Sequence, residues 1–198
     1  MLRSNRDNRT CEDMVTKSGY HYQKFDIETQ DGYVIRLNRI KNPSSFNVAY
    51  FQHGLLDNSF TWIVHGVHDS LGYQAWEAGY DVFLGNFRGI YPRRMAANRD
   101  IKDYWNYNID DLANYDLRAF TETIFQTKMV ELKQLYSGEN LSEEEIKSKL
   151  TITYIGHSLG GMVLPPYIIN SNIKKQDHHL THAILLSPAG LHLNHPFQ

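Results

Sequence analysis

The sequence predicts an α/β protein in which an antiparallel hairpin precedes a mostly parallel, doubly wound sheet. Residues 24–29 and 33–40 alternate apolar and polar side chains around Gln30-Asp31-Gly32, which is typical of a hairpin with a tight turn. Four further apolar runs lack this alternation and indicate strands covered on both faces, as in a parallel sheet. These runs span residues 47–52, 81–85, 151–155 and 182–187. Helical patterns separate them, and strands that alternate with helices build a doubly wound sheet.

The first two helices are predicted from apolar residues that recur at helical spacing. One covers residues 70–78, and Gly79 can end its last turn. The other begins at Asn106 or Asn108, either of which can cap it, and continues to about Phe125.

Of two later predicted helices, one has a favourable capping motif and the other contains two prolines. Residues 128–149 are more charged and contain a capping box that begins at Ser142, so we expect an exposed helical excursion there. The last predicted helix begins at Leu159. Pro165 and Pro166 remove backbone donors from it and disfavour helical geometry before them, so we expect a kink or an early stop.

Composition restricts the class of protein. The chain has 198 residues, of which 41% are hydrophobic, so it is long enough for one domain with a sizeable core. The whole-chain net charge of −2 gives no reason to expect a nucleic acid or an anionic membrane surface as partner. A single cysteine excludes an internal disulfide, and no Cys/His cluster has the spacing of a zinc site. The polar residues 1–10 lack the apolar region of a signal peptide, and no run has the length of a membrane span, so the compartment stays open.

The motif from Gly156 to Gly160 directly follows the predicted strand at 151–155 and reads Gly-His-Ser-Leu-Gly. Gly-x-Ser-x-Gly after a buried strand is the pattern of a nucleophile elbow, in which the serine stands on a sharp strand-to-helix turn. Glycines two residues to either side let the backbones approach without a Cβ clash. Ser158 is therefore the candidate nucleophile, and we expect it in a sparsely populated, strained region of φ/ψ space.

Acyl transfer by a serine also needs donors aimed at the oxyanion of the tetrahedral intermediate. In hydrolases with such an elbow, these donors are the backbone N–H after the serine and one in the loop after the third strand. The sequence predicts Leu159 and Leu55 for these roles, with Leu55 in the loop 53–57. Because both loops follow strands, we expect the two N–H groups at one edge of the sheet, about 3 Å from Ser158 Oγ.

Further segments around the elbow strengthen this interpretation. They are Gly19-Tyr20, Thr29 to Tyr33 with Arg39-Ile40, residues 51–63 (FQHGLLDNSFTWI), Ala78 to Val82, residues 84–89 (LGNFRG), Asp110-Asp111 and Tyr115-Asp116. Together with the elbow, from near Cys11 to about residue 190, they resemble the acid lipase family of α/β-hydrolases, which includes gastric and lysosomal acid lipases. The resemblance implies an α/β-hydrolase fold and a carboxylic ester hydrolase acting on acylglycerols, sterol esters or other acyl lipids. It also implies the roles given above to Ser158, Leu55 and Leu159, without a metal or an organic cofactor.

The sequence departs from this family in three respects. Leu159 and Gly160 stand where many animal members have Gln-Gly, and the two prolines are unusual in the helix after the elbow. The family also places a cap region after the sixth strand and its catalytic Asp and His far downstream, and this chain stops before either. We therefore expect a polar tail at 1–10 and, at 11–198, the N-terminal portion of a lipase domain that is truncated after about the sixth strand.

Several polar and aromatic residues near the predicted site have structural interpretations. We interpret His53 and His157 as packing or loop-orienting residues rather than titrating catalytic groups. The aromatic cluster at 104–107 is expected to form core or a surface that contacts the cap region.

The charged residues around the second helix are interpreted in the same way. Arg88 is expected to order its loop or to contact the acidic start of that helix. Asp110, Asp111 and Asp116 are expected to cap and solvate the helix N-terminus.

The histidines around the last strand bear on the identity of the catalytic base. Three of them precede this strand and should lie at its amino end, away from Ser158, whereas two follow it and should lie on the correct edge. The three that precede the strand are His178, His179 and His182, and the two that follow it are His192 and His195. A makeshift triad of Ser158, one of the later two histidines and Asp57 is an alternative, because triads are defined by geometry and not by order.

The leading hypothesis is an incomplete serine lipase or esterase, with an acyl-lipid or ester substrate and transient contact with a lipid interface. The competing hypothesis is a non-catalytic binding or interaction fragment that keeps the fold without the chemistry. Another α/β-hydrolase activity, such as that of a thioesterase, is a third. The serine at the elbow disfavours epoxide hydrolases and haloalkane dehalogenases, which use Asp there.

Overall fold

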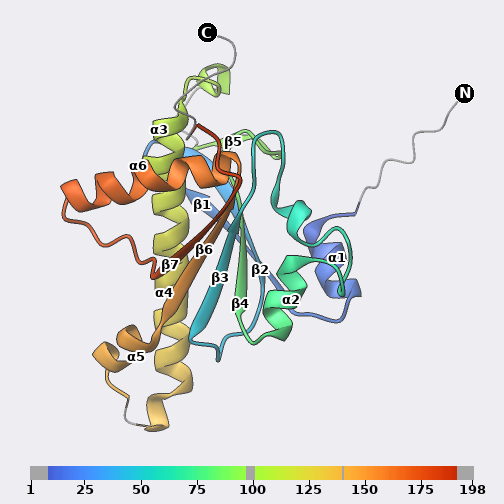
Figure 1. Cartoon of the computed structure of the whole chain (residues 1–198), viewed down its shortest axis with the longest axis vertical. Coiled ribbons are helices and arrows are strands. Elements are labelled where there is room, and N and C mark those ends of the chain that lie inside the picture. Colours follow the sequence, from blue (N-terminus) through green and yellow to red (C-terminus); the bar gives the residue numbers. More distant parts are fainter. Residues whose placement is uncertain (1–8, 97–100, 140, 191–198) are drawn as a thin grey trace, which may run out of the picture.

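One sheet runs through the centre of the molecule (Figure 1). The computed structural model describes residues 9–96, 101–139 and 141–190, and within them the sheet has seven strands in the order β1-β2-β4-β3-β6-β7, with β5 paired to β2. The strands are β1 (Tyr22–Glu28), β2 (Tyr33–Ile40), β3 (Asn47–Gln52), β4 (Asp81–Asn86), β5 (Arg94–Met95), β6 (Thr151–His157) and β7 (His182–Leu186). The short strand β5 was not expected from the sequence.

The directions of pairing confirm the predicted fold class. β3 is parallel to both β4 and β6, and β6 is parallel to β7. β1 and β2 form the antiparallel hairpin at one side, and the turn residue Gly32 has a φ of +85°, where a side chain would be strained. β1 begins at Tyr22, two residues before the predicted start, because Tyr22 still pairs with Ile40. Among the described strands β7 is the last in the order, as expected for an open edge.

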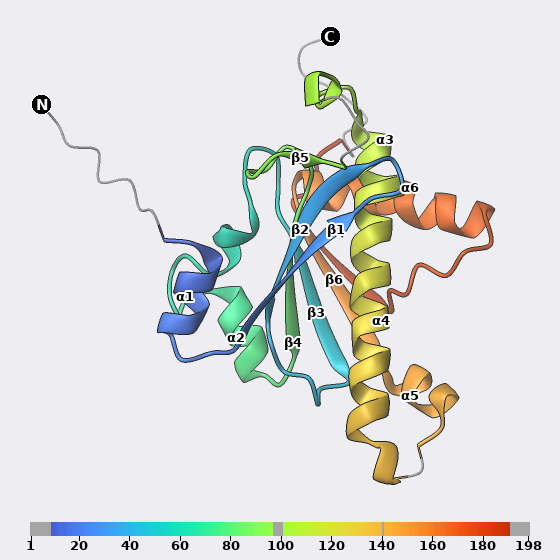
Figure 2. The same cartoon turned by 180° about the vertical axis from the view of Figure 1, so that it is seen from behind.

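Helices cover both faces of the sheet (Figures 1 and 2). α1 and α2 lie on one face, and α4 and α6 lie on the other. The helices are α1 (Cys11–Lys17), α2 (Leu71–Glu77), α3 (Ile109–Asp111), α4 (Arg118–Leu135), α5 (Glu143–Lys149) and α6 (Leu159–Ile173), with a π-helical stretch at Leu112–Leu117 and 3₁₀ turns at Ser59–Trp62, Ile101–Asp103 and Ser137–Glu139. This is the layered arrangement of a doubly wound sheet.

The two faces of the sheet hold separate apolar cores. Val48 and Tyr50 of β3 belong to the core on the α4 and α6 side, whereas Ala49 and Phe51 belong to the core on the α1 and α2 side. Successive side chains of a strand point to opposite faces, so a strand that is buried on both faces is apolar over most of its length. This explains the lack of polar alternation in the sequence of β3.

The second predicted helix is longer than the sequence pattern suggested. The helical backbone starts at α3 and ends with α4 at Leu135 rather than near residue 125. The error arose because Lys128 and Glu131 read as a solvated, charged face. Lys128 is in fact buried and donates to Asp81 Oδ2 (2.8 Å), and the Arg39 Nε also donates to Asp81, at 2.8 Å. This ion-pair network fixes α4 to the amino end of β4.

The last helix also differs from its prediction. α6 continues through Pro165 and Pro166 to Ile173, with no early stop. Val163, Leu164 and Tyr167 of this helix are buried, so packing on the sheet outweighs the local cost of the prolines.

One helix was not predicted from the sequence, and another was confirmed. α1 was not predicted, although Thr10 forms a capping box with Asp13 and so provides a start signal. The capping box at Ser142 is present and begins α5, as expected.

Candidate functional site

Ser158 stands between the end of β6 and the start of α6, in the strained turn expected of a nucleophile elbow. Its φ is 49° and its ψ is −111°, a region that side chains with a Cβ rarely adopt. Neighbouring backbone groups hold it there. The Ser158 N–H donates to Leu186 O (3.0 Å), and Ser158 O accepts from the N–H groups of Met162 (3.0 Å) and Ala189 (3.1 Å).

The glycines of the motif are required by close backbone contacts. A Cβ on Gly156 would lie 2.8 Å from the carbonyl of Gly160, and a Cβ on Gly160 would lie 2.5 Å from Gln52 O and 2.9 Å from His53 O. Backbone atoms cannot rotate away as a side chain can. The elbow therefore has its tight turn, and packs against the end of β3, only because these positions lack a Cβ.

The loop after β3 touches the candidate nucleophile. A Cβ on Gly54 would lie 3.2 Å from Ser158 Cβ and 3.1 Å from His157 Nδ1, so the residue before Leu55 packs directly on the elbow. The Leu55 N–H donates no hydrogen bond to any residue of the described chain. Its side chain is 70% exposed and that of Leu56 is 96% exposed, so this loop lies at the surface beside Ser158. That Leu55 and Leu159 both aim their N–H groups at one point near Ser158 Oγ stays a prediction.

His53 is buried and uses both ring nitrogens to connect two loops of the site. Its Nδ1–H donates to Gly54 O (2.7 Å), and its Nε2 accepts from the Phe87 N–H (3.2 Å). A proton on Nε2 would face that donor, so this arrangement requires the neutral ring, and burial lowers the pKa of His53. The contacts confirm His53 as a residue that orients the loop after β3 against the loop after β4.

Ser158 Oγ makes no hydrogen bond with any residue of the described chain. His157 is exposed and lines a cavity of about 340 Å³ together with Asp57 and Leu186, on the α2 side of the elbow. His192 and His195, the other candidate bases, lie outside the described residues. No described residue is therefore hydrogen-bonded to Ser158 Oγ in the way a catalytic base would be, and the identity of the base stays a prediction.

The three histidines before the last strand lie where the sequence placed them. His182 is the first residue of β7, and it pairs with Thr153 near the start of β6, at the opposite end from Ser158. His179 stacks on Phe125 with ring centroids 4.1 Å apart, and its Nε2 lies 2.9 Å from Glu122 Oε2. These contacts fix the connection between α6 and β7 onto α4, away from the site.

The prediction for Asp116 was wrong. Asp116 does not solvate a helix N-terminus but is fully buried, where its carboxylate accepts hydrogen bonds from Arg88 Nε (2.8 Å) and Arg88 N (2.8 Å). Burial raises the pKa of Asp116 to about 6, against the opposing effect of the Arg88 guanidinium. Arg88 also donates to both oxygens of Asp31 and stacks 3.9 Å from the centre of the Tyr33 ring. The prediction that Arg88 orders its loop is confirmed.

The other two acidic residues of that segment lie in the first turn of the helix, as expected. Asn108 caps this turn with its side chain, and Asp111 Oδ2 accepts from the Asn108 N–H (2.8 Å). Asp110 is exposed beside it, so both carboxylates interact favourably with the positive N-terminal end of the helix dipole.

Two residues that support the elbow were not predicted from the sequence. Tyr154 is fully buried below the turn and donates from its hydroxyl to Gly160 O. Pro188 packs on Gly161, where a Cβ would lie 2.8 Å from Pro188 Cβ. The second glycine of Gly160-Gly161 was the signal that another segment approaches here.

Two negative findings apply to the described residues alone. They contain no group of three or more His, Cys, Asp or Glu side chains arranged to hold a metal ion. None of their helices is both long and apolar enough to cross a membrane.

Comparison with known proteins agrees with this geometry. Residues 11–66 match the family described as a partial alpha/beta-hydrolase lipase region. Human lipase member J is 33% identical over 173 residues, which cover 82% of this chain and 41% of that protein. Human gastric triacylglycerol lipase is 33% identical over 156 residues, which cover 74% of this chain and 34% of that protein. This chain thus spans less than half the length of these relatives.

A solved structure shows the same fold. An esterase from Pyrococcus furiosus superposes with a TM-score of 0.53 at 19% identity, covering 87% of this chain and 54% of that one. The strand order, the strained serine turn and the matching sequences lead to one conclusion. The chain is a relative of the acid lipases and matches the N-terminal part of these α/β-hydrolases.

Proposed function

We propose that this chain provides the nucleophile and the oxyanion hole of a serine ester hydrolase that acts on acyl lipids. One observation carries the proposal: Ser158 stands at positive φ with Gly54 packed on its side chain. Strain of this kind amounts to about 1–3 kcal/mol and persists only where the surrounding structure enforces it, most often at functional sites. The names of the relatives, among them a triacylglycerol lipase, support an acyl-lipid substrate.

The proposed chemistry follows from the groups that surround the elbow. Ser158 Oγ attacks the ester carbonyl carbon, and the carbonyl oxygen becomes an oxyanion that accepts hydrogen bonds from the Leu55 and Leu159 N–H groups. Collapse of this intermediate expels the alcohol and leaves an acyl-serine, which water then hydrolyses. One donor of this kind typically contributes about 10²–10³ in rate. The N-terminus of the 15-residue helix α6 adds a favourable dipole beside the same oxygen.

A base must still take the proton from Ser158, and no described residue is hydrogen-bonded to Ser158 Oγ. The proposal has two forms. In the first, residues 11–198 are the N-terminal portion of a lipase domain, and the Asp and His come from polypeptide that the relatives have beyond the matched region. In the second, His192 or His195 completes a makeshift triad with Asp57. Without any base, only the residual rate of an oxyanion hole is expected, about 10³–10⁴-fold over water.

Within the described residues Ser158 Oγ has no hydrogen-bond partner, and this favours one alternative function. A fragment with this fold and no base would serve as a non-catalytic binding or interaction module. Such a module has no need of a strained serine, so the observed φ of 49° is the argument against it.

The test is an ester hydrolysis assay on residues 1–198 and on a longer chain that includes the downstream gene sequence, each with its Ser158→Ala variant. Ser148→Ala is the matched control, because Ser148 lies on α5 and its hydroxyl donates to Glu145 O of the same helix. We expect weak turnover of a short-chain activated ester by residues 1–198, and strong, Ser158-dependent turnover by the longer chain. Full turnover by residues 1–198 would select the makeshift triad. Turnover that survives Ser158→Ala in both chains would overturn the proposal.

A further inference from the structure

The floor of the cavity on the α2 side of the elbow carries two unused hydrogen-bond donors. It is formed by Trp62 and Ser70, which both line the cavity and are only 6% and 2% exposed. Within the described residues, neither Trp62 Nε1 nor Ser70 Oγ has a hydrogen-bond partner. A buried donor without a partner is costly, and such groups are rare in native proteins. These two donors therefore indicate that a ligand with acceptor atoms belongs in the cavity.

The local backbone holds both floor residues in place. Trp62 is the last residue of a 3₁₀ turn, and its ring packs on Phe51 of β3 with centroids 5.0 Å apart. Ser70 stands directly before α2, where a serine hydroxyl usually caps the helix, but it makes no such hydrogen bond here. The Ser70 N–H donates to Gly66 O (3.1 Å), and Ser70 O accepts from the Gln74 N–H (3.1 Å). In the described chain only the hydroxyl of this serine is left unused.

Gly72 brings the two floor residues together. A Cβ on this glycine would lie 2.8 Å from Trp62 O and 3.0 Å from Ile63 Cγ2. Only a residue without a Cβ lets the first turn of α2 pack so closely on the 3₁₀ turn. The floor is thus built from two elements whose relative position is fixed, as expected of a pre-formed binding site.

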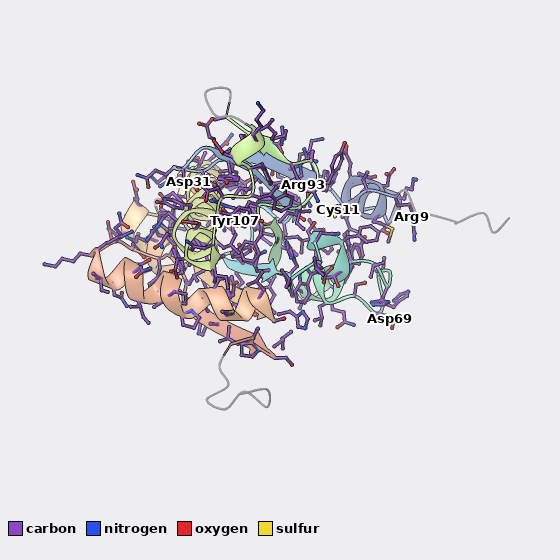
Figure 3. The ribbon with its side chains drawn as sticks, turned by 90° about the horizontal axis from the view of Figure 1, so that it is seen from above. Arg9, Cys11, Asp31, Asp69, Arg93 and Tyr107 are labelled. Atoms are coloured by element: carbon purple, nitrogen blue, oxygen red, sulfur yellow. The ribbon has the colours of Figure 1, made fainter. Side chains whose placement is uncertain are left out.

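Carboxylates stand on the rim of the same cavity. The rim carboxylates are those of Asp57, which is partly exposed, and Asp69, which is exposed. Viewed from above, Asp69 lies at the outer margin of the molecule on the α2 side (Figure 3). Asp57 Oδ1 accepts from the Asn58 N–H (2.8 Å), which leaves its other oxygen for a ligand. Among the described residues that line the cavity, none is a lysine or an arginine.

Donors on the floor and acceptors on the rim restrict the chemistry of the ligand. An apolar ligand would leave the Trp62 N–H and the Ser70 hydroxyl unpaired. An anion would meet the two rim carboxylates with no lysine or arginine to offset them. An ammonium group could pair with the rim but has no acceptor for the Trp62 N–H. A hydroxyl group both donates and accepts, so a compound with several hydroxyl groups satisfies the floor and the rim together.

We propose that this cavity binds a small neutral polyhydroxyl compound. Its hydroxyl oxygens accept from the Trp62 N–H and the Ser70 hydroxyl, and its hydroxyl hydrogens bond to the rim carboxylates. The volume of about 340 Å³ is near the lower end of ligand sites, which span about 300–1,000 Å³, so the ligand is compact. His157, directly before Ser158, also lines the cavity, so the bound compound contacts the elbow. The site uses none of the atoms of the proposed ester hydrolysis and goes beyond that function.

Binding is measured by NMR from the indole N–H signals of the isotope-labelled chain 1–198, with glycerol and myo-inositol as probes. The chain has three tryptophans, and the Trp62 signal is assigned with the Trp62→Phe variant. Trp76 serves as an internal control, because its Nε1 already donates to Lys41 O (3.1 Å). We expect a saturable shift of the Trp62 signal and no shift of the Trp76 signal.

Variants of the floor and the rim test the assigned contacts. Ser70→Ala and Asp69→Asn should each weaken binding at least about threefold, as the loss of one hydrogen bond does. Ser148→Ala on α5 is the matched control and should bind as the unaltered chain does. Ser70→Ala should also keep the urea midpoint, because the hydroxyl has no partner in the described chain. Inositol monophosphate should bind at least about tenfold more weakly than myo-inositol, because the rim carboxylates repel it.

Several results would overturn the proposal. They are the absence of a saturable Trp62 shift with either probe, equal shifts of the Trp62 and Trp76 signals, unchanged binding in Ser70→Ala, and equal binding of inositol monophosphate. A lower urea midpoint for Ser70→Ala would also overturn it, since the hydroxyl would then have a partner inside the chain. So would loss of binding in the longer chain, because downstream polypeptide would then fill the cavity. Ser158→Ala should bind both probes normally, so this result is independent of the proposed ester hydrolysis.

Discussion

Removal of the Arg88 side chain is the perturbation whose effect the structure defines best. Arg88 is buried and forms two ion pairs. One partner, Asp116, is fully buried, and the other, Asp31, is partly exposed. Arg88→Met keeps the apolar stem and its packing on Tyr33 but leaves the carboxylate of Asp116 without a counterion. Breaking a buried pair from one side typically lowers the free energy of unfolding by about 3–5 kcal/mol. Because a domain is stable by only about 5–15 kcal/mol, this variant should lose a large part of its stability.

The loss should depend on pH with a definite sign. Burial raises the pKa of Asp116 to about 6 in the folded protein, above its unfolded value, so the folded state holds this proton more tightly. The contribution of Asp116 to stability is therefore present at low pH and is lost as the pH rises through about 6. Without Arg88 the folded pKa rises further. Arg88→Met should accordingly cost less at about pH 5, where Asp116 is protonated, than at about pH 7.5.

Urea unfolding followed by circular dichroism at the two pH values measures this difference. The double variant Arg88→Met/Asp116→Leu is the control, because replacing both partners removes the unpaired charge and should recover most of the loss. A loss below about 1 kcal/mol in the single variant, or a larger loss at the lower pH, would refute the argument that this pair is buried and ionised. Failure of the double variant to recover would show that packing and not charge dominates.

Three further outcomes are expected. Gly160→Ala should lower the free energy of unfolding by about 3 kcal/mol or more, because its Cβ would meet the carbonyl oxygens of Gln52 and His53 at the end of β3. Gly138→Ala, with open space around it, should change the urea midpoint little. Ser142→Ala should cost about 1 kcal/mol through the capping box of α5, and an unchanged midpoint would contradict the cap. Ile184→Lys should reduce concentration-dependent light scattering at neutral pH, because it places a charge on the exposed strand β7, and unchanged scattering would show that this edge does not drive association.

Much of the fold follows from local pattern. Val48 to Phe51 of β3 are all apolar because the strand is buried on both faces, and this pattern marks it as a central parallel strand. Asp31-Gly32 marks the hairpin because the turn needs a positive φ. The glycines at 156 and 160 likewise locate the elbow, since each faces backbone at less than 3 Å.

The errors share a physical cause, which is that burial of a charge depends on partners far away in the chain. Asp116 and Lys128 look solvated in sequence, and each is buried because an arginine or an aspartate from another strand or loop meets it. α6 shows the same principle for prolines, since its packing on the sheet overrides a local preference against helix. The base for Ser158 could not be located by pattern at all, because a triad is assembled from residues distant in sequence.

The most direct test of the central claim is a crystal structure of the longer chain used in the ester hydrolysis assay, after reaction with an alkyl fluorophosphonate, a reagent that labels base-activated serine nucleophiles. The account predicts an adduct on Ser158 whose phosphoryl oxygen accepts hydrogen bonds from the Leu55 and Leu159 N–H groups, each at about 3 Å. A phosphoryl oxygen turned to solvent with Leu55 bonded elsewhere, or a label on another residue with Ser158 unmodified, would contradict it.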